Sequence, residues 1–554
     1  MISQIKRYTR QKSRVVKNAL ITIFLVLSTI ASATDYYISS SGNDTNNGLS
    51  SSTPWKTIAK VNSSSFSAGD SIFFNRGDEW REQLRINQSG TVSSRITFTA
   101  YGVGAKPIIN GADVITGWGD TYNNINANIW GIVDPSATAG KTLVVIDDSL
   151  YTQVVTLAEL TSPRKYWINK ASTPDSLYLW SKTDPNVKVT EIAHRDYGIY
   201  SYEHNYITIS YLDVRNAGSS GIYLGGTLQD GYCIVDSIYA YRNRLAGIEL
   251  VGTDFSHNLV TNCVATYNGN GILGWEGANN TTFSHCYTAH GVHNYIDPSA
   301  SSDGSGFQFY LSDNVIVEYC ESYDDATSIF LDPGAQGTYN MTARYNYVHE
   351  SQAGRAGIGL NPVGAGASIY VYYNLIVDCG GGNYEVGSLH VAGNNLGMVY
   401  IYNNTIYNPA TARNTKGALI LEYGSANTVL KNNIVYYKTI GDYAMFSAAN
   451  AALSTEAFIS DYNIWYDAST SKTYQFWINH KGYETLTPWR SHSRQDLHSQ
   501  ETDPLFINNA YDWTLQSGSP AINAGIDVGL TKDFKGNPII GLPDIGAFES
   551  QIDQ

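Results

Sequence analysis

The sequence is poor in charge: Asp, Glu, Lys and Arg make up only 15% of its 554 residues, and the formal net charge is −14. Lys is absent between Lys188 and Lys416, and Lys and Arg form no cluster outside the first twenty residues. We therefore expect no nucleic-acid partner, because phosphate neutralisation needs clustered cations. The chain is instead rich in Gly (50) and Tyr (42), which favours strands and tight turns over helices.

Long apolar runs are also missing, apart from residues 19–30. This run follows six basic residues and ends before Ala31-Ser32-Ala33, which has the small-x-small pattern of a cleavage site. A membrane anchor is the alternative, but a span needs roughly 20 apolar residues. We expect a signal peptide over residues 1–33, secretion or export to the periplasm after cleavage near Ala33, and no membrane span.

Cysteine is scarce, and its odd number excludes complete internal pairing in an exported chain. No CxxC or Cys/His spacing typical of a zinc site occurs. Each Cys ends an apolar strand of a repeating unit, so we predict that stacked units align the thiols into one buried ladder. The five residues are Cys233, Cys263, Cys286, Cys320 and Cys379.

A loose repeat organises the centre of the chain. A Gly before an aliphatic or aromatic residue recurs between Gly221 and Gly357, with Ser328 in one of the slots, at spacings of 22 to 35 residues. Residues then alternate, so that Ile248 and Leu250 face one way and Glu249 faces the other. No helix of ten or more residues separates the strands. The pattern predicts an all-β solenoid of stacked parallel coils.

The ends of the solenoid differ from its middle. Residues 34–112 are predicted to form the first coils and a cap, with a short amphipathic helix near residues 56–61 that covers the open strand edge. Residues 113–200 interrupt the repeat with short strands and are predicted to be an all-β insertion. Residues 201–450 form the central coils, and residues 451–554 the last coils and a second cap.

Motifs at both ends resemble those of exported bacterial right-handed parallel β-helix proteins with the pectin-lyase-like fold. The resemblance covers nearly the whole mature chain and implies a right-handed, single-stranded parallel β-helix. Family members with known activities are mostly polysaccharide lyases and glycoside hydrolases, so the resemblance also implies a polysaccharide substrate. The matching segments are Tyr36-Tyr37-Ile38-Ser39, Gly42-Asn43-Asp44, Pro54-Trp55-Lys56-Thr57-Ile58, Asp503-Pro504-Leu505-Phe506 and Asp544-Ile545-Gly546-Ala547-Phe548-Glu549.

The longest turn of the repeat lies between Cys286 and Gly306, and long polar excursions on a rigid array are where function tends to lie. It ends at Asp303, and Asp324 and Asp325 occupy the matching place one coil later. Coils stack about 4.8 Å apart, so these carboxylates are predicted to share one surface patch. The order of Asp303-Gly304-Ser305-Gly306-Phe307 and then Asp324-Asp325 also resembles the calcium-binding coils of one group of pectate lyases.

Three roles are open for these acids: proton transfer in glycoside hydrolysis, Ca²⁺ binding beside a uronate, and the capping of turns. We predict Asp303, Asp324 and Asp325 as catalytic residues, or as ligands of a possible Ca²⁺. No other cofactor is expected. The predicted substrate-binding residues are His290, His293, Gln308, Arg355, Glu276 and Tyr310.

A polysaccharide lyase needs a base that takes the proton beside a uronate carboxyl group, and the central coils contain no Lys for this role. A glycoside hydrolase is therefore our first hypothesis. A lyase with an Arg, His or Tyr base is the second, and a non-catalytic polysaccharide-binding or adhesin solenoid is the third. We expect a monomer in each case.

Overall fold

The computed structural model describes most of the chain after the first 32 residues. The described residues are 33–119, 128–134, 142–171, 175–227, 231–276, 278–291, 304–334, 339–352, 355–361, 364–380, 386–392, 397–408, 418–422, 427–437, 446–448, 457–468, 475–478, 481–508 and 510–551. No helix among them is long and apolar enough to cross a membrane. The predicted signal peptide lies outside these residues, apart from Ala33.

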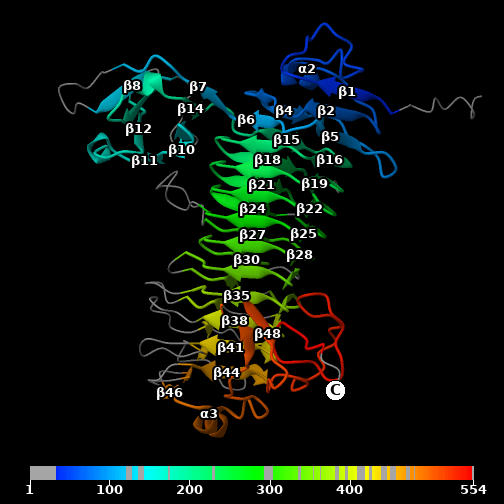
Figure 1. Cartoon of the computed structure of the whole chain (residues 1–554), viewed down its shortest axis with the longest axis vertical. Helices are drawn as coiled ribbons and strands as arrows, with labels where there is room; N and C mark the ends of the chain where they lie inside the picture. The colour runs from blue at the N-terminus through cyan, green and yellow to red at the C-terminus, as the bar shows by residue number, and fades with distance from the viewer. Residues whose placement is uncertain are drawn as a thin grey trace, which may run out of the picture.

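The structure is a right-handed parallel β-helix made of three long sheets, which we name A, B and C. In each coil the chain adds a strand to sheet C, then to sheet A, then to sheet B, and returns to sheet C. Figure 1 shows the coils stacked along the long axis of the molecule. The predicted all-β solenoid is confirmed.

The strands of each sheet are given in the order in which they lie side by side. Sheet A contains β1 (Asp35–Ile38), β2 (Ser71–Asn75), β5 (Ile96–Tyr101), β16 (Ile207–Ser210), β19 (Ile234–Asp236), β22 (Leu259–Thr261), β25 (Thr282–Ser284), β28 (Val315–Glu318), β31 (Asn340–Arg344), β34 (Ser368–Tyr372), β37 (Met398–Tyr402), β40 (Thr428–Lys431) and β43 (Phe458–Asp461). Sheet B contains β3 (Glu79–Trp80), β6 (Ile108–Asn110), β17 (Asp213–Arg215), β20 (Tyr239–Tyr241), β23 (Val264–Thr266), β26 (Tyr287–Ala289), β29 (Glu321–Tyr323), β32 (Tyr347–His349), β35 (Leu375–Val377), β38 (Thr405–Asn408), β41 (Ile434–Tyr437) and β44 (Ile464–Asp467). Sheet C contains β4 (Leu84–Ile86), β15 (Ile199–Tyr202), β18 (Ser220–Gly225), β21 (Ala246–Val251), β24 (Asn270–Trp275), β27 (Phe307–Tyr310), β30 (Ile329–Asp332), β33 (Ile358–Leu360), β36 (Leu389–Val391), β39 (Leu419–Leu421), β42 (Phe446–Ala448), β45 (Phe476–Ile478) and the antiparallel β46 (Lys481–Tyr483).

The register of the strands explains the single narrow core. Ile222 pairs with Ile248 and Ile248 with Ile272, so identical side chains stack along the axis, and all three are fully buried. The residues between them point outward, as the two-residue alternation predicts. The apolar half of each strand therefore fills the core, and the other half is free to vary in chemistry.

Cysteines and asparagines form one ladder at the turn between sheets A and B. Cys286 and Cys320 stack there, and Cys320 N–H donates to Asn346 Oδ1 at 3.0 Å, where a ladder of asparagines begins. All five thiols are free and buried, as predicted. The prediction of one ladder for all five is wrong, because Cys233 precedes a sheet A strand and Cys379 follows a sheet B strand.

Each end of the solenoid is covered by a helix. The N-terminal helix α2 (Ile58–Asn62) starts at Thr57, whose side chain accepts a hydrogen bond from Lys60 N–H, and it buries Ile58 and Val61. The predicted helical cap is confirmed, two residues later than its predicted start. At the other end, α3 (Leu486–Ser493) places Trp489 in the core.

The insertion between β6 and β15 is all-β, as predicted. Its described residues form two four-stranded sheets and two short 3-10 helices (Leu157–Glu159 and Pro185–Val187) beside the first coils (Figure 1). Its strands are β7 (Ala112–Val114), β8 (Ile129–Val133), β9 (Val144–Ile146), β10 (Ser149–Leu150), β11 (Thr152–Gln153), β12 (Lys165–Asn169), β13 (Ser176–Trp180) and β14 (Thr190–Ala193).

After α3 the chain turns back along the last coils (Figure 1). The hairpin of β47 (Phe506–Asn508) and β48 (Asp512–Leu515) packs on the outer face of sheet B, where Phe506 and Trp513 contact the ring of Tyr407. The final segment then hydrogen-bonds to the turns between sheets A and B, for example from Asn403 Nδ2 to the carbonyl of Asp544 at 3.0 Å. The tail therefore covers two sides of the last coils.

Candidate active site

The outer face of sheet C brings together side chains that are far apart in the chain. Trp275 pairs in register with Tyr310, and Tyr310 with Asp332, so the three residues follow one another across three coils. The rings of Trp275 and Tyr310 lie 4.9 Å apart. Gln308 Nε2 donates to the Tyr310 hydroxyl from within the same strand. We name this surface, with Phe330, the sheet C strip.

Asp332 is the carboxylate of the sheet C strip. Its Oδ2 accepts a hydrogen bond from Asn361 Nδ2 at 2.8 Å, and its Oδ1 accepts one from Gly334 N–H at 2.9 Å. Two donors from the following turn and the next coil therefore hold the group at the edge of the strip. The position of Asp332 follows from strand alternation: Asp332 is two residues after Phe330, so both side chains lie on the same face of β30.

His390 and Glu422 lie further along the same face. His390 pairs in register with Gly359, and its Nε2 lies 3.3 Å from Glu422 Oε2. The sequence reasoning did not single out either residue. Strand alternation could have found them, because His390 lies between the buried Leu389 and Val391 of β36, and Glu422 follows the buried Leu421 at the end of β39.

A second group of polar residues lies at the B–C corner, which we define as the turns that lead from sheet B strands to sheet C strands. His290 Nδ1 lies 2.8 Å from Asp324 Oδ2, and the Asp324 side chain is 44% exposed. The imidazole stacks on the ring of Tyr267 at 4.5 Å and meets the edge of Tyr323 at 5.3 Å. Asp324 is thus an accessible acid whose position is held by a hydrogen bond with His290.

The backbone explains how these residues reach the corner. His290 and Asp324 have positive φ angles of 57° and 48°, and Asp378 occupies the matching position two coils later with a φ of 50°. A left-handed residue in each coil turns the chain sharply between the two sheets. The side chains of successive coils therefore stack at the corner.

Asp325 points the opposite way from Asp324. Its carboxyl group is only 1% exposed and accepts hydrogen bonds from Thr288 Oγ, Ser322 Oγ and Gly291 N–H, each at 2.7 Å. Burial raises the pKa of Asp325 to about 7, against the lowering effect of these donors. Because Thr288 and Ser322 face the core, Asp325 belongs to an interior network. The two neighbouring acids do not share one surface patch, which differs from the sequence prediction.

The remaining predicted residues have mixed placements. Asp303 and His293 lie outside the described residues. Glu276 directly follows Trp275, is exposed and has a φ of 49°. Arg355 lies in the next corner turn, where its carbonyl accepts a hydrogen bond from Ser351 Oγ at 3.0 Å. The structure thus brings Gln308 and Tyr310 to the strip and His290 and Asp324 to the corner, while Glu276 follows the strand that contains Trp275.

No group of three or more His, Cys, Asp or Glu side chains in the described part of the chain is placed to hold a metal ion. Asp324 faces His290, whereas the carboxyl oxygens of Asp325 accept hydrogen bonds from two hydroxyl groups and one backbone N–H. The two acids therefore do not converge on a common Ca²⁺ position. The possible Ca²⁺ site stays a prediction that depends on Asp303.

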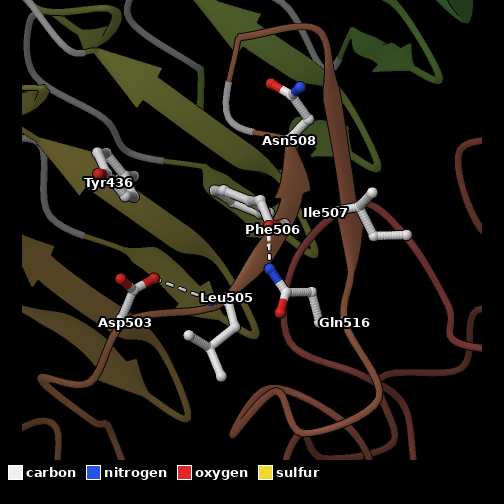
Figure 2. Close-up of a pocket in the computed structure, with 7 residues that line it drawn as sticks. All are labelled: Tyr436, Asp503, Leu505, Phe506, Ile507, Asn508 and Gln516. Atoms are coloured by element: carbon white, nitrogen blue, oxygen red, sulfur yellow. Dashed lines mark hydrogen bonds between the residues drawn. The ribbon is translucent and has the colours of Figure 1, made fainter.

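A cavity of about 390 Å³ lies elsewhere, on the outer face of sheet B. Figure 2 shows that its walls come from Tyr436 of β41 and from the segment around β47. Within it, Gln516 Nε2 donates to the Phe506 carbonyl at 2.7 Å, and Asp503 Oδ1 accepts from Leu505 N–H at 2.9 Å. None of the predicted site residues that the structure describes lines this cavity, so the cavity is separate from the strip and the corner.

Comparisons with known proteins agree with this architecture. The family model described as a right handed beta helix region matches residues 197–396, which contain the strip and the corner. The solved complex of XylC with xylose aligns over 93% of this chain and 98% of its own, with a TM-score of 0.63 and 13% identity. The fold is that of the right-handed β-helix proteins.

A curated relative extends the comparison to nearly the whole sequence. Lacto-N-biosidase of Bifidobacterium longum subsp. longum is 24% identical over 618 aligned residues, which cover 95% of this chain. The alignment spans only 37% of the length of that relative.

Proposed function

We propose that the protein is a glycoside hydrolase that binds a polysaccharide or a long oligosaccharide along the sheet C strip and cleaves it at the B–C corner. The observation that supports this most is the exposed Asp324, paired with His290, in the same coils as the aromatic and polar strip. Aromatic faces pack on the apolar faces of sugar rings, and amide and carboxylate groups bind their hydroxyls. The similarity to a protein named lacto-N-biosidase is consistent with this proposal.

The chemistry requires one carboxyl group that donates a proton to the glycosidic oxygen and a second that activates water or attacks the sugar. Asp324 is the accessible candidate for one role, and His290 holds it in place. Asp303 is our candidate for the other. Gly304, the residue after it, accepts a hydrogen bond from Ala326 N–H at 2.8 Å, next to the two acids of the following coil. Asp325 would act as a positioning residue for the turn.

The charge of the strip favours a hydrolase over a lyase. None of the sheet C strands from β15 to β39 contains Lys or Arg, whereas they contain Glu249 and Asp332. A lyase removes the proton beside a uronate carboxyl and needs a cation that neutralises this group. An acidic surface repels such a polymer.

The test measures product release from a panel of plant, algal and animal glycans. The wild type should release reducing ends, and Asp324→Asn should lower kcat/KM by about 100-fold or more, as expected for loss of a general acid or base. Asp303→Asn should have a similar effect. Asp378→Asn is the matched control, because Asp378 has the same backbone conformation at the same corner two coils away; it should stay within about twofold of wild type.

Three results would contradict the proposal. Products that absorb ultraviolet light through a new C4–C5 double bond would indicate a lyase. Binding to a glycan without any bond cleavage would indicate an adhesin. Full activity of both Asp324→Asn and Asp378→Asn would show that bond cleavage does not take place at the B–C corner.

We also propose that the chain is exported as a monomer after removal of residues 1–33. The strand β1 begins at Asp35, two residues after the cleavage site, so removal would leave the first coil intact. N-terminal sequencing of the exported protein tests the cleavage site, and light scattering tests the monomeric state. A mature chain that starts at Met1, or a stable dimer at micromolar concentration, would contradict them.

A further inference from the structure

A second cluster lies on the outer face of sheet C, closer to the N-terminus than the strip. Tyr200 pairs in register with Tyr223, and Tyr223 with Glu249. The rings of Tyr200 and Tyr223 stack at 5.4 Å, and Tyr197 lies 4.8 Å from Tyr223 and 5.2 Å from Tyr200. All three rings are partly exposed. The cluster therefore presents aromatic surface beside the carboxyl group of Glu249.

Glu249 is unusual for an outward-facing residue of a solenoid. Its side chain is only 7% exposed, and Ser220 Oγ donates a hydrogen bond to Oε2. Burial raises the pKa of Glu249, and no cation contributes to the shift. Burying a carboxyl group with one neutral donor costs free energy that a Val or Thr at this position would avoid. Such a cost is typical of a functional group rather than of a structural one.

The insertion borders the same coils. Arg242 pairs with Asp148 of the insertion and lies over the ring of Tyr241 at 4.1 Å. The turn that contains Arg242 leads directly into β21, which contains Glu249. The insertion thus contacts the B–C corner at the turn that leads into the strand of Glu249.

We propose that Tyr197, Tyr200, Tyr223 and Glu249 form a distal subsite for an uncharged sugar residue of the glycan that the strip binds. The tyrosine rings pack on the apolar face of the sugar, and Glu249 hydrogen-bonds its hydroxyls. Because no cation among the described residues acts on Glu249, a uronate carboxylate is disfavoured in the subsite. This inference depends on the proposed binding of a glycan along sheet C.

The position of the subsite sets the length of the preferred substrate. Glu249 lies on β21, three coils before β30, whose preceding turn contains Asp324. Three coils correspond to about 14 Å along the axis. A disaccharide bound at the corner does not reach the subsite, whereas a chain of several sugar residues does. The subsite therefore contributes only to long substrates.

The experiment measures binding of the full chain to immobilised glycans and to soluble oligosaccharides of two and six residues. The neutral probes are xylan, β-glucan, mannan and galactan series, and the anionic probes are polygalacturonate and alginate. Tyr223→Ala and Glu249→Gln should weaken binding of the six-residue oligosaccharide about tenfold and leave the two-residue affinity unchanged. Tyr223→Phe should retain most of the affinity, because it keeps the ring. Tyr370→Ala, on the outer face of sheet A, is the matched control.

The outcomes separate this inference from the proposed function. If Tyr223→Ala and Glu249→Gln, folded as judged by thermal midpoint, bind the six-residue chain like wild type, the subsite is refuted while hydrolysis stands. If these variants lose long-chain affinity but the wild type cleaves nothing, the subsite stands and the hydrolase fails. Binding to polygalacturonate or alginate alone, or to none of the probes, overturns the subsite.

Discussion

The interior acid Asp325 allows a direct test of the network below the B–C corner. Two substitutions are compared, Asp325→Asn and Asp325→Ala. Asn keeps the shape and can accept from Gly291 N–H while it donates to a hydroxyl of Thr288 or Ser322. Ala leaves three buried donors without this acceptor, and each such donor costs about 1–3 kcal/mol. We therefore expect Ala to lower the free energy of unfolding by about 3 kcal/mol or more at pH 5.

The pH dependence of the wild type follows from the raised pKa. The pKa of Asp325 is about 7 in the folded protein, above its ordinary value of 3.8, because burial disfavours the charged form. Below pH 4 the carboxyl group is protonated in both states, and its contribution to stability is fully present. Between pH 4 and pH 7 only the unfolded chain loses the proton, so stability falls by about 1.4 kcal/mol per pH unit. Asp325→Asn removes this loss.

The assay is guanidinium unfolding at pH 5 and pH 8, with hydrogen exchange of peptides that cover β26 to β30 as the local measure. Between pH 5 and pH 8 the stability of Asp325→Asn should rise by about 2–3 kcal/mol relative to wild type, because only the wild type continues to lose stability over this range. Asp325→Ala should be the less stable of the two variants at both pH values. Two results would contradict the proposed role of Asp325: a stability difference between wild type and Asp325→Asn that does not change with pH, or equal stability of the Asn and Ala variants.

Three further predictions concern other parts of the molecule. Asn374→Ala should destabilise the solenoid by about 2–4 kcal/mol, because Asn374 Oδ1 accepts from Asn346 N–H and its Nδ2 donates to Asn404 Oδ1; an unchanged unfolding midpoint would contradict a structural role of the ladder. Burial raises the pKa of the Cys286 thiol, so a thiol reagent should label it only after unfolding, and rapid labelling of the native protein would refute its burial. A hydrogen bond to Asp134 raises the pKa of His194, so the contribution of His194 to stability is present at low pH and is lost as the pH rises through the raised pKa. His194→Ala should therefore speed proteolysis of the insertion at pH 6, and equal cleavage rates of variant and wild type would contradict this role.

The sequence alone determined the repeat and the direction of the strand residues. Alternation predicted that Ile248 and Leu250 face one way and Glu249 the other, because side chains in a strand change sides with a strict period of two. The Gly spacing and the lack of long helices predicted parallel coils. These features depend on local chemistry, which a single sequence contains.

Which acids lie together depends on the three-dimensional packing of the coils. Asp324 and Asp325 follow one another in the chain, but the positive φ of Asp324 turns the backbone, so one carboxylate faces solvent and the other faces the core. The alternation of side chains along a strand does not extend through such a turn, so it cannot predict the direction of either carboxylate. The neighbours of Glu249 and the position of Asp148 beside Arg242 likewise depend on how coils and insertion pack. Long-range packing, which no local pattern encodes, places them.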